Sequence, residues 1–86
     1  MMTAKQMAAE IQRLTNDQEP WIQPIGNGIM LHVRLMPRRH FGVWYLVWVT
    51  RDRPGHHWSS RKITAMTPMT AGQKARSLVT QYGGAS

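Results

Sequence analysis

The chain has 86 residues, no cysteine and a formal net charge of +7, with 11 Lys and Arg residues against 4 Asp and Glu residues. This length predicts one small domain with a single core over residues 1–86. The lack of cysteine excludes disulfides and thiolate metal sites, and the longest apolar run is too short to cross a membrane. The N-terminus lacks a basic start followed by an apolar run, which predicts a cytoplasmic protein.

Residues 3–15 are expected to form the first helix. Thr3 can cap this helix, and Gln6 stands at the position that completes a capping box. Apolar residues recur at helical spacing and predict one buried stripe, made of Met7, Ala8, Ile11 and Leu14. Because so short a helix is marginal alone, its stripe must pack against the rest of the domain.

Two strands are expected next. Residues 21–25 are typical of an edge strand, because Pro24 cannot donate a hydrogen bond to a central ladder. A glycine-rich turn precedes residues 29–36, which alternate between two faces. One face is apolar and predicts a core contact by Ile29, Leu31, Val33 and Leu35. The other face carries His32 and Arg34 and is expected to be at least partly in contact with water.

Residues 43–50 predict a third strand, which is apolar on both faces. Its β-branched face, with Tyr45, is the better candidate for the core, so that Trp44 and Trp48 share the other face with His32. With Trp58, these two Trp residues are the candidates for stacking or for a dimer interface. Burial under a second helix layer is a third alternative, and burial or dimerisation is favoured over base stacking because large aromatic residues are more often structural.

A turn is expected over residues 51–55, followed by a weaker strand over residues 58–66. The register of that strand is uncertain, because Ser59-Ser60-Arg61-Lys62 interrupts any apolar face. The complete order is α-β-β-β-β-α. Since all connections between strands are short, the sequence predicts an α+β domain with an antiparallel meander of three to four strands.

The last helix is expected to begin at Thr67-Pro68 or at Thr70. Pro68 suits a first helical position, whereas Thr70 with Gln73 matches a second capping box. Gly83-Gly84 is a stop signal. The predicted buried stripe of this helix comprises Ala71, Ala75, Leu78, Val79 and Tyr82.

Positive charge is concentrated in the middle of the chain. Residues 1–31 sum to −1, residues 32–62 to +6 and residues 63–86 to +2. So uneven a field favours a polyanionic partner, namely a nucleic acid, a nucleoprotein complex or an acidic protein surface. The candidate binding residues are Arg34, Arg38, Arg39, Arg51, Arg53, His56, His57, Arg61 and Lys62.

Catalysis is poorly supported. A nucleophilic triad would need Asp52, a histidine of the pair His56-His57, and Ser59 or Ser60, yet no strained nucleophile turn accompanies them. Neighbouring histidines on a strand point to opposite faces, so they do not form a metal pair. The sequence therefore predicts no catalytic residue, no metal and no cofactor, and a protein that is not an enzyme.

The order of elements is similar to that of double-stranded-RNA-binding domains, with Lys74 and Arg76 near the start of the last helix, where that family has phosphate-binding lysines. Residues 41–82 are similar in order to the arm-binding domains of phage integrases. In its whole build, the chain resembles the small phage and prophage proteins of the anti-CRISPR kind: it is tiny, has no catalytic constellation and has a biased surface charge.

The anti-CRISPR resemblance implies an inhibitor that occupies the surface of a nucleic-acid-guided defence complex without chemistry. Two alternatives stay open at this point. One is a free-standing DNA- or RNA-binding protein that acts in regulation or recombination. The other is a homodimeric structural or interaction protein whose interface is the aromatic sheet face.

Overall fold

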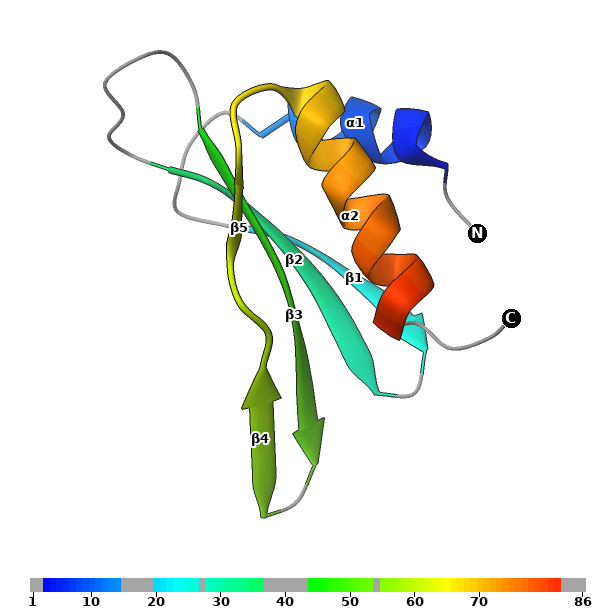
Figure 1. Ribbon diagram of the computed structural model, residues 1–86, viewed down its shortest axis with the longest axis vertical. Coiled ribbons are helices and arrows are strands. Elements are labelled where there is room, and N and C mark those ends of the chain that lie inside the picture. The colour runs from blue at the N-terminus through cyan, green and yellow to red at the C-terminus, as the bar shows by residue number, and fades with distance from the viewer. Residues whose placement is uncertain (1–2, 15–19, 27, 37–43, 54, 83–86) are drawn as a thin grey trace.

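The computed structural model describes residues 3–14, 20–26, 28–36, 44–53 and 55–82. Its elements are α1 (Ala4–Gln12), β1 (Trp21–Gly26), β2 (Ile29–Leu35), β3 (Tyr45–Arg53), β4 (His56–Ser59), β5 (Ile63–Ala65) and α2 (Pro68–Tyr82). The strands form one antiparallel sheet in the order β1-β2-β3-β4, and β5 also pairs with β3. Both helices lie on the same side of this sheet (Figure 1). The predicted α+β domain with an N-terminal helix, an antiparallel meander and a C-terminal helix is confirmed.

Helix α1 begins where the sequence predicts but ends earlier. The N–H of Gln6 donates to Oγ1 of Thr3 at 3.1 Å, and the N–H of Thr3 donates to Oε1 of Gln6 at 2.8 Å, so the capping box forms. The N–H of Leu14 bonds to the Ile11 carbonyl at 3.0 Å, a three-residue spacing that tightens and ends the helix. The predicted helix over residues 3–15 is therefore too long at its C-terminal end.

Helix α2 begins at Pro68, the earlier of the two predicted starts. Oγ1 of Thr67 accepts a hydrogen bond from the N–H of Thr70 at 3.1 Å, which makes Thr67 the cap and leaves Pro68 as the first helical residue. Gly72 lies where α2 crosses α1. A Cβ atom at this position would lie 2.6 Å from the carbonyl oxygen of Ala4 and 2.9 Å from the nitrogen of Ala8, so only glycine allows this close approach.

Strand β3 is longer than predicted. The expected turn over residues 51–55 is wrong at its start, because Arg51 and Asp52 continue the ladder opposite Trp58 and His57. The chain reverses beside Gly55, whose φ of +76° favours glycine. The hairpin of β3 and β4 consequently extends beyond the part of the sheet that the helices cover (Figure 1).

The strand predicted over residues 58–66 is divided into β4 and β5, and Ser60 accounts for the break. Its N–H donates to the carbonyl of Val49 at 2.9 Å, and its Oγ accepts from the N–H of Val49 at 3.0 Å. The hydroxyl thus takes the place that a backbone carbonyl has in a regular ladder. Pairing resumes at Ile63 opposite Val47. Arg61 and Lys62, predicted on the fourth strand, lie in the irregular segment between the two strands.

The core lies between the sheet and the two helices. Sheet residues with at most 2% of their surface exposed are Ile29, Leu31, Val33, Val47 and Val49. Met7 and Ile11 from α1 and Ala71 and Ala75 from α2 are equally buried against them. The predicted assignment of the two faces of β2 is therefore confirmed. In β3 it is confirmed for Tyr45, Val47 and Val49, whereas Val43 lies outside the described residues.

Candidate functional site

The sheet face opposite the two helices, which we call the outer face, carries most of the candidate chemistry. The strand register assigns its members. They are Ile22 and Pro24 of β1, Met30, His32 and Arg34 of β2, Leu46, Trp48, Thr50 and Asp52 of β3, Ser59 and His57 of β4, and Thr64 of β5. All of them are half-buried or exposed, and none is a core residue.

Four side chains form a line across this face, which we call the ring row. His32 and Trp48 are backbone partners on β2 and β3, and their rings stack with centroids 5.0 Å apart and planes 6° apart. That separation is close to the distance of about 4.8 Å between neighbouring strands, so the two parallel rings stack across the β2–β3 pair. Ile22 is the β1 partner of His32, and Nζ of Lys62 lies 5.3 Å from the Trp48 ring centroid. Two aromatic rings thus lie between an exposed aliphatic residue and a cation.

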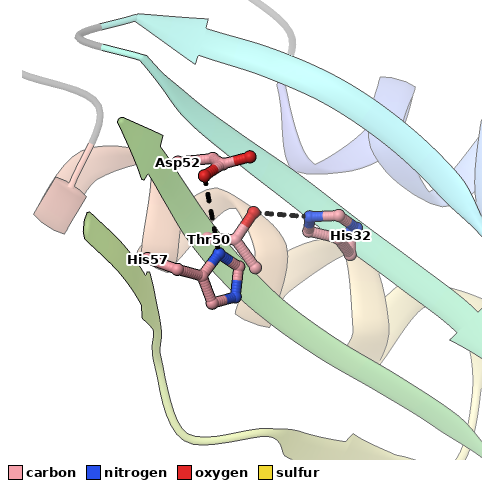
Figure 2. A network of polar contacts seen from close by, with 4 residues as sticks. All are labelled: His32, Thr50, Asp52 and His57. Atoms are coloured by element: carbon pink, nitrogen blue, oxygen red, sulfur yellow. Dashed lines mark hydrogen bonds and ion pairs between the residues drawn. The ribbon is translucent and has the colours of Figure 1, made fainter. Parts of the chain in front are cut away.

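His32 is held in place by its surroundings. Its Nε2 lies 2.8 Å from Oγ1 of Thr50, and the direction of this hydrogen bond depends on the imidazole tautomer (Figure 2). Burial lowers the pKa of His32 below its usual range, because the charged imidazolium loses water there. At neutral pH, His32 therefore contributes a flat uncharged ring to the row rather than a positive charge.

The charges on and beside the outer face are mostly positive near the ring row. Arg34 follows His32 by two residues on the same face, and Lys62 and its neighbour Arg61 are exposed. Towards the β3–β4 hairpin, Asp52 lies 3.8 Å from His57, with both side chains largely exposed (Figure 2). An exposed pair of this kind contributes little to stability. The part of the outer face around the ring row is thus cationic, whereas the end near the hairpin also carries the negative charge of Asp52.

The structure separates other predicted site residues from the outer face. Arg51 is in register with Ile29 on one side and Trp58 on the other, which places all three on the helix side of the sheet. Nε of Arg51 is buried and has no hydrogen-bond partner among the described residues. Trp58 lies against Tyr82 of α2, with ring centroids 5.3 Å apart. Trp48 and Trp58 therefore belong to different surfaces.

The remaining predicted cations are only partly located. Arg53 and His56 are backbone partners beside the hairpin turn. Arg38 and Arg39, also among the predicted binding residues, lie outside the described residues. The predicted binding residues between Arg51 and Lys62 therefore do not share one surface: Lys62 reaches the outer face, whereas Arg51 lies on the helix side.

The residues of the hypothetical triad do not meet as a triad requires. Oγ of Ser59 donates to the carbonyl of Ser60 at 3.3 Å, and Oγ of Ser60 donates to the carbonyl of Arg61 at 3.2 Å. His57 contacts Asp52, at a distance longer than a good hydrogen bond. Within the described ranges, no three His, Asp or Glu side chains gather as metal ligands would.

A shallow pocket of about 380 Å³ lies between β5 and the start of α2. Its lining residues are Trp44, Thr64, Ala65, Met66, Thr70 and Lys74. Nζ of Lys74 donates to the carbonyl of Thr64 at 2.7 Å, so the cation of this pocket already has a partner. The pocket offers less for a polyanion than the ring row does.

Sequence reasoning missed two members of the outer-face site. Ile22 is 45% exposed and extends the ring row to the sheet edge. The alternation of β1 could have indicated this, because Trp21 and Ile25 are the residues of that strand that pack on the core. Thr50, which fixes the His32 ring, carries no signal in the sequence, since the bond joins residues 18 positions apart.

Neither helix in the described part of the chain has the length and apolarity that crossing a membrane requires. Comparison of the chain with protein-family models, with curated proteins and with solved structures gave no match. The residues of the site itself are therefore what indicates a function.

Proposed function

We propose that this protein is a non-enzymatic binding protein that engages a nucleic acid or a nucleoprotein complex through its outer face. The observation that carries this proposal is the ring row, in which the stacked pair of His32 and Trp48 lies beside the cation of Lys62. Nucleic acids present flat bases and regularly spaced phosphates, which match rings and cations in one surface. The net charge of +7 adds a long-range attraction for such a partner.

Charge favours this partner over a second copy of the chain. A symmetric dimer with the ring row at its two-fold axis would bring the cations of both copies into one interface, those of Arg34, Arg61 and Lys62. Like charges that face each other oppose association, whereas phosphates neutralise them. The electrostatics of the outer face therefore fit a polyanion better than they fit a homodimer.

The inhibitor of a nucleic-acid-guided defence complex, expected from the resemblance in build, stays a prediction and is one form of this proposal. In such a complex, an exposed nucleic-acid strand or a neighbouring acidic surface would meet the outer face. Tight capture of the nucleoprotein without affinity for naked nucleic acid would favour the inhibitor. Salt-dependent binding to naked nucleic acid would favour the free-standing binder.

The proposal is tested by charge reversal at matched positions. The double variant Arg61→Glu/Lys62→Glu changes two exposed cations beside the ring row. The control variant Lys5→Glu/Arg13→Glu makes the same change of net charge at Lys5 of α1 and at Arg13, the residue that caps the C-terminal end of this helix, and both residues are also exposed. Binding is measured by fluorescence anisotropy with labelled single- and double-stranded oligonucleotides over a range of salt concentrations.

We expect the Arg61/Lys62 variant to bind at least about 10-fold more weakly than the control variant, because it loses local phosphate contacts. Equal losses in the two variants would show that net charge alone matters and would contradict a site on the outer face. Unchanged affinity in both variants, or no affinity of the wild-type protein for any nucleic acid or nucleoprotein, would overturn the proposal.

A further inference from the structure

The Trp48 ring has a different neighbour on each side. His32 approaches from β2, which pairs with one edge of β3. Lys62 approaches from the other edge, because it directly precedes Ile63, the β5 partner of Val47. Trp48 is thus flanked by an aromatic ring on one side and by an ammonium group on the other.

These two neighbours differ in how firmly they are held. His32 lies within β2 and its ring contacts Thr50, so the stacked side of Trp48 is part of the folded framework. Lys62 is exposed, lies between β4 and β5, and makes no hydrogen bond or ion pair within the described part of the chain. Its contact with Trp48 can therefore be replaced without breaking the sheet.

We propose, building on the proposed function, that the ligand is a single-stranded nucleic acid. One of its bases stacks on the side of Trp48 that Lys62 occupies in the free protein. The ammonium group of Lys62 moves from the ring to a neighbouring phosphate of the same strand. Lys62 thus covers the base site in the absence of ligand and becomes a phosphate contact in its presence.

Relative interaction strengths support this replacement. Stacking of one base on an aromatic side chain changes affinity by about 5- to 150-fold. An exposed cation–π contact is worth less than this, and the displaced lysine gains an ion contact in return. A duplex keeps its bases paired and stacked inside, so it cannot offer a base to Trp48 without being opened.

The first experiment separates stacking from charge attraction. Fluorescence anisotropy measures binding of the wild-type protein to an oligothymidine of about 12 nucleotides and to an abasic strand with the same phosphates. We expect the strand with bases to bind about 5- to 150-fold more tightly. In Trp48→Leu, which keeps apolar bulk without a ring, this preference should disappear. Trp48→Phe, with a smaller ring, should retain part of it.

The outcomes distinguish this inference from the function on which it rests. Equal affinity of the wild-type protein for the two strands would overturn base stacking and leave the binding of phosphates, and thus the proposed function, intact. Tighter binding to a duplex of the same length would also overturn the inference alone. Lack of binding to every nucleic acid and nucleoprotein would overturn both. Because the wild-type comparison needs no variant, poor folding of Trp48→Leu does not affect it.

The second experiment tests the movement of Lys62. In Lys62→Ala, loss of one phosphate contact should reduce the slope of log affinity against log salt by about 0.7 for a single strand. At high salt, where the phosphate contact is weak, the variant should bind the oligothymidine as tightly as the wild type or more tightly, because Trp48 is already uncovered. The control variant Lys5→Ala removes the same charge from α1 and should leave the slope unchanged. An unchanged slope in Lys62→Ala would contradict the movement.

A second copy of the chain is the competing occupant of the ring row. Sedimentation equilibrium of the wild-type protein should show a monomer in the concentration range of the binding measurements. A concentration-dependent dimer that dissociates in Trp48→Leu, in a protein whose affinity for oligothymidine is weak, would overturn the inference in favour of a dimer interface.

Discussion

The two faces of the sheet are built from the same strands, yet they differ in nearly every physical property. On the helix side, Leu31, Val33, Val47 and Val49 have no exposed surface. On the outer face, the neighbouring residues are half-buried or exposed and include the rings of His32 and Trp48 and the cation of Arg34. Adjacent residues of one strand thus contribute to different tasks, because side chains alternate between the faces.

The two faces also differ in how much of their surface is available to a ligand. The helix side is filled by α1 and α2, whose approach at Gly72 leaves no room even for a methyl group. Around the ring row of the outer face, the contacts include a ring stack, a side-chain hydrogen bond and a cation–π contact. Such contacts are individually weak, so a ligand can replace some of them at little expense to the fold.

The largest expected effect contrasts two neighbours on β2. Leu31→Ala creates a cavity in the core and should lower the free energy of unfolding by about 2–5 kcal/mol. Met30→Ala, on the outer face, should lower it by about 1 kcal/mol or less. Urea denaturation followed by circular dichroism measures both values. Equal destabilisation by the two variants would show that the outer face is as tightly packed as the core.

A smaller effect is expected at the crossing of the helices. Gly72→Ala places a methyl group within 2.6 Å of the Ala4 carbonyl oxygen, so α1 must move away from α2. We expect a loss of about 1–2 kcal/mol in the free energy of unfolding, even though alanine favours the helix by about 1 kcal/mol. The neighbouring exposed substitution Gln73→Ala is the control and should be neutral or slightly stabilising. A Gly72→Ala variant more stable than the wild type would contradict the close helix contact.

The smallest effect concerns pH and the outer face. Burial lowers the pKa of His32, so the folded state binds a proton less readily than the unfolded chain does. The contribution of the neutral His32 to the free energy of unfolding should therefore be fully present above the pKa of histidine in the unfolded chain. It should decrease as the pH falls from that pKa towards the lowered pKa of the folded state.

The variant His32→Phe isolates that contribution. It keeps a flat ring opposite Trp48 but cannot titrate, so its thermal stability should vary less between pH 8 and pH 5 than that of the wild type. Differential scanning fluorimetry at a series of pH values measures the difference. A wild-type profile no steeper than that of His32→Phe would contradict an uncharged, partly buried His32.

Much of the fold could be predicted from local patterns. The alternation of residues 29–35 identified which side of β2 meets the core, and Thr3 with Gln6 identified the start of α1. The break at Ser60 could not be predicted, because it depends on a hydroxyl that bonds to Val49 across the sheet. Gly72 was also missed, since a glycine within a helical pattern indicates neither that a second helix crosses there nor how closely.

The sequence predicted the residue types of the candidate site better than it predicted their arrangement in space. The sequence indicated that Trp48 shares a face with His32, and the ring stack agrees. It did not indicate that Trp58 lies on the other side of the sheet, because that depends on the pairing of Trp58 with Arg51. The approach of Lys62 to Trp48 likewise depends on the break between β4 and β5. No local sequence pattern indicates this break.

The interruption at residues 60–62 has a further consequence for the borders of the sheet. A continuous border of N–H and C=O groups invites a strand from another molecule, and proteins commonly disrupt it with prolines, bulges and charges. Along β1, Pro24 lacks an N–H group and the register shifts before Gly26. Along the opposite border, β4 and β5 are divided by a segment that carries Arg61 and Lys62. Both borders of the described sheet are thus protected against strand addition, which favours a chain that resists aggregation into fibres.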